Sequence, residues 1–498
     1  MILRPCVLPA CAVLSWLLAG CATTMPPRPP VPEGENCLQL FEQFDRRIDA
    51  AGVADAGYSR IPGFPYLRSD RFSASFADEI DDMDTFWEWV GYLRANEDEA
   101  REIELRNLNL GVQTASSVLI DLRGCGAWLR SWELDDKAFR EHLLSVVEPP
   151  DDYSTVARTL GLYPLARPFL RRGVSQYQQQ VMERFDTPIE DLETHGELLL
   201  WQAARSEEFP HETLDLRDKP RDRLGRIGML WSEVRQLAQF HAPQFWIDTA
   251  AEHDLPGQPV VGTEVPGVDV QQPVVYFLPG YARFGGRNLL QISYFVWFDR
   301  HASGDAAAGP LDGLIWRVTL DERGHPILHD TIHACGCYHY AFPAVAMQRR
   351  EIADDRETLL FPQDGVPSGA VAVRLASGTH AVQRGVAPEQ VTAAATREFE
   401  LRPYDELLLL PLPEGGTQSL FDPDGFVAGT ERTERLWLWP SGVRNAGAMR
   451  QWGKHATEFV GRRHFVFGRQ SGGFDFGFLR HRLTEIGLHL IDFSLSSG

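Results

Sequence analysis

The hydrophobic pattern of this chain changes its period once, near residue 241, and this change constrains the fold more than any other feature. Before that point apolar residues recur at helical spacing. One such stripe consists of Phe86, Trp89, Val90 and Leu93. After it, short apolar runs alternate with Gly, Pro and Asp, which is typical of strands. We therefore predict an α+β fold, with a helical domain at 36–241 followed by a β-rich domain at 242–498.

The β-rich part has a recognisable central segment. Candidate strands include Leu289–Phe298, Leu314–Leu320, Thr331–Phe342 and Leu436–Trp439. Both faces of Leu289–Phe298 are mainly apolar, so this strand is expected in the middle of a sheet. Because no helical segments alternate with these runs, we expect a mainly antiparallel, β-sandwich-like domain and not a parallel α/β sheet.

The N-terminus has the features of a secretory signal peptide at 1–20. Arg4 precedes an apolar run, Val7–Leu18, that is too short to span a bilayer. The residues Leu18-Ala19-Gly20-Cys21 that follow resemble the lipobox of bacterial lipoproteins. The resemblance implies cleavage before Cys21 and attachment of acyl chains, such as palmitate, to that cysteine. The alternative is an ordinary secretory signal with an incidental cysteine.

The lipobox resemblance also implies a location. Ala22 stands where Asp would oppose sorting to the outer membrane. The segment 21–35 then combines the lipidated cysteine with five prolines, which favour an extended tether. We expect an outer-membrane lipoprotein that faces the periplasm or the cell surface. Its partners would be the membrane, through the lipid anchor, and an envelope polymer or protein.

The charge of the chain excludes one class of partner. Lys and Arg total 48 against 69 Asp and Glu, a net charge of −21. Such a field repels nucleic-acid phosphates, so we expect no nucleic-acid partner.

Four cysteines remain once the signal peptide is removed and Cys21 is acylated: Cys37, Cys125, Cys335 and Cys337. An even number in an oxidising compartment allows two disulfides. Cys37 and Cys125 each lie on an apolar helical face, so they are expected either to form a bridge or to remain as two buried thiols.

The segment from His329 to Tyr340 concentrates residues that bind metals. On a single strand, His333, Cys335, Cys337 and His339 would project from one face. Neighbours at i and i+2 are about 6.6 Å apart and can share an ion, whereas i and i+4 cannot. The remaining ligands would come from His380, His455 or His464. Thiolate and imidazole donors favour zinc or copper as the cofactor.

Two alternatives compete with the metal site. A disulfide between Cys335 and Cys337 is within reach, because Gly336 lets the chain pucker, and plain core packing is the other. The stretch Ile332–His339 resembles one in Gram-negative envelope lipoproteins to which no activity is attached, so the resemblance implies no chemistry.

A basic segment, Arg444–Arg469, stands out in this acidic chain, with six basic residues against Glu458 alone. It predicts an anion site for a lipid phosphate, a peptidoglycan carboxylate or a substrate acid. Its candidate residues are Arg450, Lys454, Arg462 and Arg463. The alternative is an internal seam in which these side chains pair with the acidic helical domain.

The chain contains no G-x-S-x-G, H-E-x-x-H, Walker A or G-x-G-x-x-G motif. Two function classes therefore stay open. The first is a binding or scaffold module of the cell envelope. The second is a metal-dependent envelope enzyme that uses the strand at 329–339.

Overall fold

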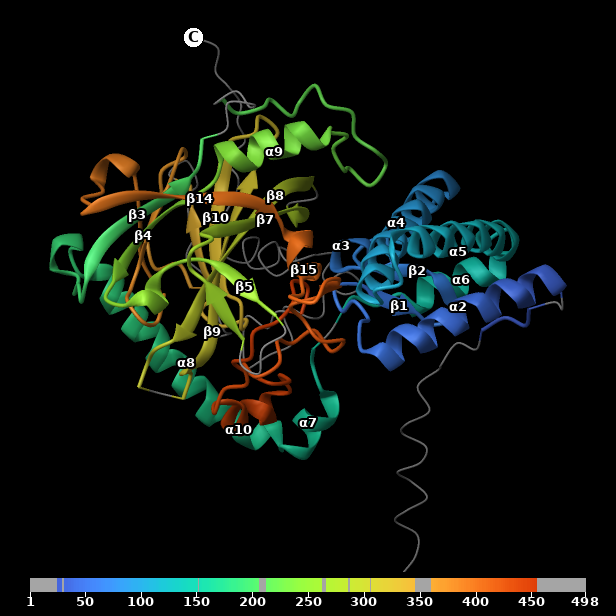
Figure 1. The fold of residues 1–498 in the computed structure, drawn as a ribbon, viewed down its shortest axis with the longest axis horizontal. Coiled ribbons are helices and arrows are strands. Elements are labelled where there is room, and N and C mark those ends of the chain that lie inside the picture. Colours follow the sequence, from blue (N-terminus) through green and yellow to red (C-terminus); the bar gives the residue numbers. More distant parts are fainter. Residues whose placement is uncertain are drawn as a thin grey trace, which may run out of the picture.

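The computed structural model shows two units side by side, a helical unit (residues 32–146) and a sheet unit (residues 152–454) (Figure 1). Their order along the chain agrees with the predicted α+β class, helices first and most strands later. The described residues are 25–28, 31–150, 152–205, 212–261, 266–284, 287–304, 306–344 and 360–454. Cys21 lies outside them.

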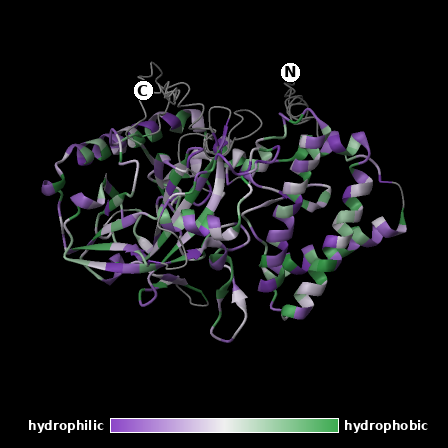
Figure 2. Cartoon of the chain, turned by 90° about the horizontal axis from the view of Figure 1, so that it is seen from above, coloured by the Kyte–Doolittle hydropathy of each residue, from purple (hydrophilic) through white to green (hydrophobic). Residues whose placement is uncertain are grey.

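The helical unit is built from amphipathic helices around a small hairpin. Its elements are α2 (Pro32–Ala51), β1 (Ser59–Ile61), β2 (Phe64–Ser69), α3 (Arg71–Ala74), α4 (Met83–Asn107), α5 (Val112–Glu133) and α6 (Lys137–Val146). Figure 2 shows hydrophilic and hydrophobic residues alternating along these helices. The stripe predicted from Phe86 to Leu93 lies on α4 and is fully buried.

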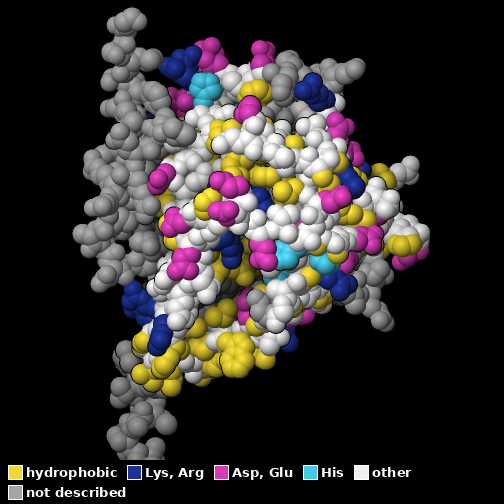
Figure 3. Space-filling view, turned by 90° about the vertical axis from the view of Figure 1, so that its left-hand side faces the viewer, with side chains coloured by type: hydrophobic (Ala, Val, Ile, Leu, Met, Phe, Trp, Pro, Cys, Tyr) yellow, Lys and Arg dark blue, Asp and Glu magenta, His cyan; other side chains and the backbone are white. Residues whose placement is uncertain are grey.

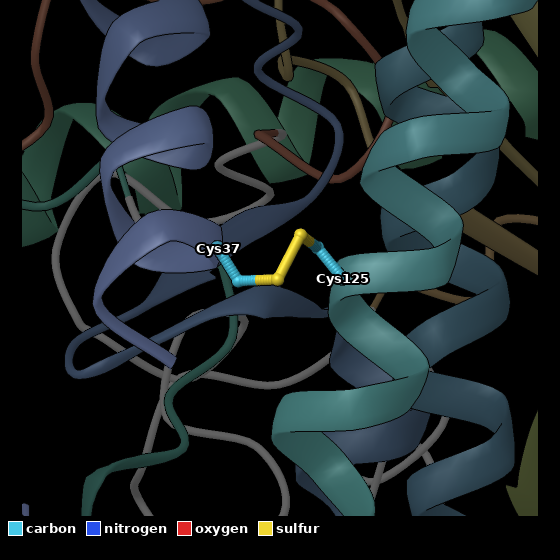
Figure 4. The surroundings of a disulfide bond; sticks show 2 residues. All are labelled: Cys37 and Cys125. Atoms are coloured by element: carbon cyan, nitrogen blue, oxygen red, sulfur yellow. A yellow bond between two sulfur atoms is a disulfide. The ribbon is translucent and has the colours of Figure 1, made fainter. Parts of the chain in front are cut away.

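Two local features fix the ends and the spacing of these helices. Asp82 caps α4 by accepting a hydrogen bond from the Thr85 amide at 2.9 Å. Cys37 of α2 and Cys125 of α5 form a disulfide, the first of the two outcomes that the sequence left open (Figure 4). The bond links helices that are 88 residues apart in sequence.

A buried ion network lies inside the helical unit. The Arg68 guanidinium donates to Glu97 at 2.5 Å and to both carboxylate oxygens of Glu104 at 2.8 Å. Arg101 lies 2.8 Å from Asp45 and from Glu97. Each buried charge therefore has an opposite partner, as burial requires.

The segment before α2 packs on the helical unit. Met25 contacts the core of this unit, and the Arg28 side chain lies 2.5 Å from Glu133. The described part of the expected tether therefore contacts the protein surface and does not stand away from it.

The sheet unit contains one mixed sheet of ten described strands in the order β11-β10-β9-β8-β7-β14-β3-β4-β12-β13. Its strands are β3 (Glu197–Ala203), β4 (Gln244–Thr249), β7 (Val274–Phe284), β8 (Arg287–His301), β9 (Gly309–Leu320), β10 (Pro326–His333), β11 (Tyr340–Pro343), β12 (Ala372–Leu375), β13 (Val382–Val386) and β14 (Ala395–Pro403). Two packed antiparallel sheets were expected, and a single sheet with parallel pairs is found. The prediction missed the parallel pairs because their partners are remote in sequence.

Strand β14 joins the two halves of this sheet. Its first half, Ala395–Phe399, pairs in parallel with β3, and its second half, Glu400–Pro403, pairs in parallel with β7. On the β7 side the strands from β7 to β11 are antiparallel. On the other side β3 pairs antiparallel with β4, so a strand from the range expected to be helical is part of the sheet.

Both faces of the sheet are covered. Helices α8 (Tyr163–Asp186) and α9 (Trp231–Phe240) pack on one face, where Tyr294 of β8 donates a 2.8 Å hydrogen bond to the Ala238 carbonyl. The other face packs against residues 404–452 and Ile103 of α4. Strand β8 is buried on both faces, as predicted for a central strand.

Short elements complete the sheet unit. They are α7 (Thr155–Leu160), η1 (Ile189–Asp191), η2 (Glu252–Asp254), β5 (Gln258–Val260), β6 (Gly267–Asp269), η3 (Pro388–Gln390), η4 (Tyr404–Leu408), β15 (Leu410–Pro411), β16 (Thr417–Gln418), α10 (Arg435–Leu438) and η5 (Trp439–Ser441). The segment Leu436–Trp439 was predicted to be a strand. It is helical instead, and most of its side chains are exposed, so no sheet surface holds it extended.

Candidate functional site

The predicted strand Thr331–Phe342 is two strands joined by a turn. Strand β10 ends at His333 and β11 begins at Tyr340. Between them Gly336 and Tyr338 have positive φ angles of 84° and 59°, and the His333 amide donates to the Cys337 carbonyl at 2.9 Å. The prediction of one continuous face is therefore wrong, because the chain reverses within it.

The reversal separates the expected metal ligands. His333 lies 3.6 Å from Asp312, whereas His339 lies 3.3 Å from Asp330. Cys335 and Cys337 are buried free thiols, so the structure does not contain the alternative disulfide. Within the described part of the chain no group of three or more His, Cys, Asp or Glu side chains is arranged to hold a metal ion. His455 and His464 lie outside the described residues.

A cluster that the sequence did not reveal surrounds the Asp312 carboxylate. His301 of β8 and His380 of the β12–β13 turn place Nδ1 at 2.9 and 2.8 Å from the same oxygen. His333 approaches the other oxygen, and Asp254 of η2 lies 3.4 Å from His380 Nε2. The ring of His380 stacks on Phe298 with centroids 3.8 Å apart. Five elements thus meet at one buried carboxylate.

The protonation states in this cluster follow from burial and pairing. Burial disfavours the charged form of Asp312, but the hydrogen bonds with His301 and His380, together with the nearby His333, hold the pKa of this carboxyl well below its usual range. Burial also disfavours charged His380, but the nearby carboxylate of Asp254 and the hydrogen bond to Asp312 raise the pKa of His380. Burial lowers the pKa of His333. Because all members of the cluster are buried, we interpret it as a structural cluster that stabilises the packing of these five elements.

The structure does not bring the four residues of the predicted anion site together on one described surface. Arg450 is buried, and its Nη1 donates to Asp152 at 3.0 Å while its Nη2 donates to two backbone carbonyls. Its guanidinium therefore serves an internal pair and is not presented to an external anion. Lys454 is partly buried near Gly425. Arg462 and Arg463 lie outside the described residues.

A cleft lies where the helical unit meets the sheet unit, with a volume of about 140 Å³. The helical unit supplies residues from the β1 region, α3 and α4, and the sheet unit supplies β7, η4 and residues 451–453. Half of the lining residues are carboxylate or aromatic: Tyr58, Asp70, Phe72, Tyr92, Glu99, Tyr281, Tyr404, Asp405 and Trp452. Among the described lining residues Arg71 is the only base. The cleft is therefore an acidic, aromatic site between the two units.

Hydrogen bonds and ring contacts hold the walls of this cleft. Tyr92 donates to Asp70 at 2.8 Å, and Asp70 accepts from the Ser73 amide as the cap of α3. The rings of Phe72 and Tyr281 stack across the boundary between the units with centroids 5.4 Å apart. Opposite them, the Trp452 amide donates to the Tyr404 hydroxyl at 3.0 Å. The lining is thus positioned before any ligand binds.

Two carboxyl groups of the cleft, those of Glu99 and Asp405, have raised pKa values. Glu99 and Asp405 reach solvent, yet protein surrounds them on most sides. Burial, followed by the charge of Asp405, raises the pKa of Glu99 to about 7. Burial raises the pKa of Asp405 as well. Anionic groups that are costly to ionise favour a bound cation, and perturbed carboxyls of this kind are common in functional clefts.

Only a weak signal for this cleft is present in the sequence. Glu99 is one of 11 acids between Asp78 and Glu104, a run that reads as a solvated helix face. Asp405 is 306 residues later in the chain. Only the packing of α4 against η4 brings them to one cleft.

Comparison with protein-family models, with curated proteins and with solved structures finds no match to this chain. In the described residues no helix is long and apolar enough to cross a bilayer.

Proposed function

We propose that this chain is a lipid-anchored envelope protein that binds a small ammonium-bearing ligand in the cleft between its two units. The observation that carries the proposal is the meeting of Glu99, Asp405 and Asp70 with a wall of aromatic rings in one cleft. Carboxylates compensate the charge of an ammonium group, and aromatic faces attract it. The volume suits a small amine or the cationic end of a larger molecule.

Two features support the envelope location. The lipobox-like Leu18-Ala19-Gly20-Cys21 follows a secretory signal. The disulfide between Cys37 and Cys125 is typical of proteins that fold in an oxidising compartment such as the periplasm. Acyl chains on Cys21 would hold the protein at the outer membrane, facing the periplasm or the cell surface.

Calorimetric titration of the purified protein with choline and putrescine tests the proposed ligand class. Binding at pH 8 should weaken several-fold in Glu99→Gln and in Asp405→Asn, because each loses one compensating charge. Glu406→Gln is the matched control, since Glu406 adjoins Asp405 but does not line the cleft. The neutral choline analogue 3,3-dimethylbutanol should bind much more weakly than choline.

The pH dependence gives a second readout. Because the pKa of Glu99 is about 7, lowering the pH from 8 to 6 neutralises this carboxylate and should weaken amine binding. Glu99→Gln should remove most of that dependence. Equal binding of choline and its neutral analogue, or no binding of either amine, would overturn the proposed ligand class.

A further inference from the structure

A group of eight large apolar side chains is exposed on one end of the sheet unit. Each has at least 44% of its surface accessible: Val156, Leu160, Leu162, Leu165, Phe169, Leu436, Trp437 and Trp439. They belong to α7, the start of α8, α10 and η5, which pack against one another. Figure 3 shows hydrophobic side chains gathered at the lower end of the molecule with basic side chains beside them, and Figure 1 shows α7 and α10 at that end. We call this surface the apolar end.

Contacts among less exposed residues stabilise the packing of the elements that form the apolar end. Arg158 of α7 donates to the Tyr153 hydroxyl at 2.8 Å, and its guanidinium lies 3.7 Å from the ring centre of Tyr163 in α8. Gly161 lets α7 approach η5 so closely that an added Cβ would lie 2.7 Å from Pro440. The exposed residues are therefore not needed to hold these elements together. An exposed apolar surface of this size is unfavourable in water and is typical of a site that binds a partner or a membrane.

The charge of this surface is opposite to that of the rest of the protein. From Tyr153 to Met182 the sequence has four arginines and no Asp or Glu, and from Arg435 to Arg450 it has three arginines and no acid. The chain as a whole has a net charge of −21. Arg167, Arg172 and Arg435 are exposed among the apolar residues. Arg450 is buried against Asp152, and Arg444 lies 3.5 Å from Asp152 and 4.0 Å from Asp424, so the exposed Arg167, Arg172 and Arg435 give this surface its basic character. A basic surface in such an acidic protein is complementary to an anionic partner.

A hollow in the same surface has basic residues in its lining. It has a volume of about 510 Å³ and lies between α7 and α10, with Arg435 and Arg444 in its lining next to Leu436 and Trp439. Phosphate oxygens accept hydrogen bonds from guanidinium groups, while the adjoining tryptophan and leucine would lie among acyl chains. One surface thus offers both contacts that a phospholipid requires.

We propose that the apolar end docks on the surface of a bilayer that contains anionic phospholipids. Trp437, Trp439, Phe169 and Leu165 enter the interface between headgroups and acyl chains, and the arginines bind the phosphates. Interfacial helices bind membranes in this way, through apolar area together with attraction to anionic lipids. The proposal rests on the envelope location given above. Figure 1 supports it, because α2, the first helix after Cys21, lies along the lower edge of the helical unit, on the same side as α7 and α10.

Vesicle co-sedimentation of the chain without its signal peptide (residues 21–498), carrying Cys21→Ser, tests this docking without acyl chains. The vesicles contain phosphatidylethanolamine and phosphatidylglycerol at 3:1, and phosphatidylcholine vesicles serve as the uncharged comparison. Binding to the anionic vesicles is expected, with weaker binding at 0.5 M NaCl. The triple variant Leu165→Ser, Phe169→Ser, Trp437→Ser should lose at least tenfold in partitioning. Arg172→Gln with Arg435→Gln should lose about fivefold per arginine, since each contributes about 1 kcal/mol near an anionic surface.

Matched control variants distinguish docking through the apolar end from non-specific binding of exposed apolar residues to vesicles. Val112 and Ile120 of α5 are 85% and 66% exposed on the helical unit, and their serine variants should bind vesicles as the parent does. All substituted apolar side chains are exposed, so the variants should keep their melting temperature. Unchanged vesicle binding by the triple variant would overturn the proposal. So would a dimer in size-exclusion chromatography that the triple variant abolishes, because the surface would then bind a second copy. Neither result depends on acylation of Cys21 or on amine binding in the cleft.

Discussion

The guanidinium of Arg450 lies 3.0 Å from the carboxylate of Asp152, and both side chains are fully buried. The pair connects the chain just before α7 with the segment after η5. The same contact region contains Tyr153 and Val443, which form an isolated bridge beneath the apolar end. A buried ion pair therefore links the segment before α7 to the segment after η5, and these two segments lie beneath the apolar end.

Removing one partner of this pair should be costly. Arg450→Met leaves the Asp152 carboxylate buried without its main compensating charge, and we expect the free energy of unfolding to fall by about 3–5 kcal/mol. Urea denaturation measures the change. Arg444→Gln removes an exposed guanidinium 3.5 Å from the same carboxylate and should cost less than about 1 kcal/mol. Equal effects of the two substitutions would show that Arg450 is not the principal partner.

The disulfide of the helical unit should make a large contribution to stability. Replacing Cys37 and Cys125 together by alanine releases a crosslink between positions 88 residues apart, which the chain-entropy estimate values at about 4–5 kcal/mol. Thermal unfolding with and without reductant measures the loss. A thiol titration of the processed, unfolded and unreduced protein should find Cys335 and Cys337 only. Four reactive thiols would contradict the pairing.

His329 should make the protein sensitive to acid. Burial, followed by the charge of His241, lowers the pKa of His329 to about 3, so this side chain is neutral in the folded state. The unfolded chain binds a proton near pH 6.5, and stability should therefore fall as the pH drops from about 6.5 towards 3. His329→Phe should flatten this part of the stability profile. His195→Phe, at an exposed histidine, is the matched surface substitution.

If Cys21 carries the proposed acyl chains, Cys21→Ser should release the protein from the outer membrane or leave it unprocessed, because those chains would provide the stable anchor. Fractionation of cells in detergent-free buffer with 0.5 M NaCl is the appropriate measurement, since salt weakens the arginine contacts of the apolar end. A Cys21→Ser protein that still co-fractionates with the outer membrane under these conditions would contradict acylation as the anchor.

Local periodicity was sufficient to predict much of the helical unit. The stripe from Phe86 to Leu93 is buried on α4, and the apolar faces of Cys37 and Cys125 meet at the disulfide. Helices that follow one another in sequence bury faces whose pattern is contained in each segment. The central position of β8 was predictable for the same reason, because both of its faces are apolar.

The candidate sites could not be predicted because they depend on contacts between remote segments. Five elements contribute to the cluster at Asp312, and Glu99 and Asp405 meet only through packing of the two units. The sequence does contain one indication of the cluster, the ionisable Asp312 within an apolar strand. A charged residue that is buried needs a partner, so its position predicts a buried polar contact. The expected metal row failed because Gly336 and Tyr338 adopt positive φ angles, which the alternation of residue types does not reveal.

The pairing of β14 also determines when the sheet can be completed. Its residues Ala395–Pro403 bond to β3 on one side and to β7 on the other, although β3 leaves the ribosome almost 200 residues earlier. Until β14 is present, the strands near β3 and those near β7 are separate pieces with open edges. Closing such long loops slows folding, and open edges are prone to pair with other chains. If the chain is exported in extended form, as we propose, it has to be kept from aggregating until β14 has crossed the membrane, because the assembly of the sheet depends on this single strand near residue 400.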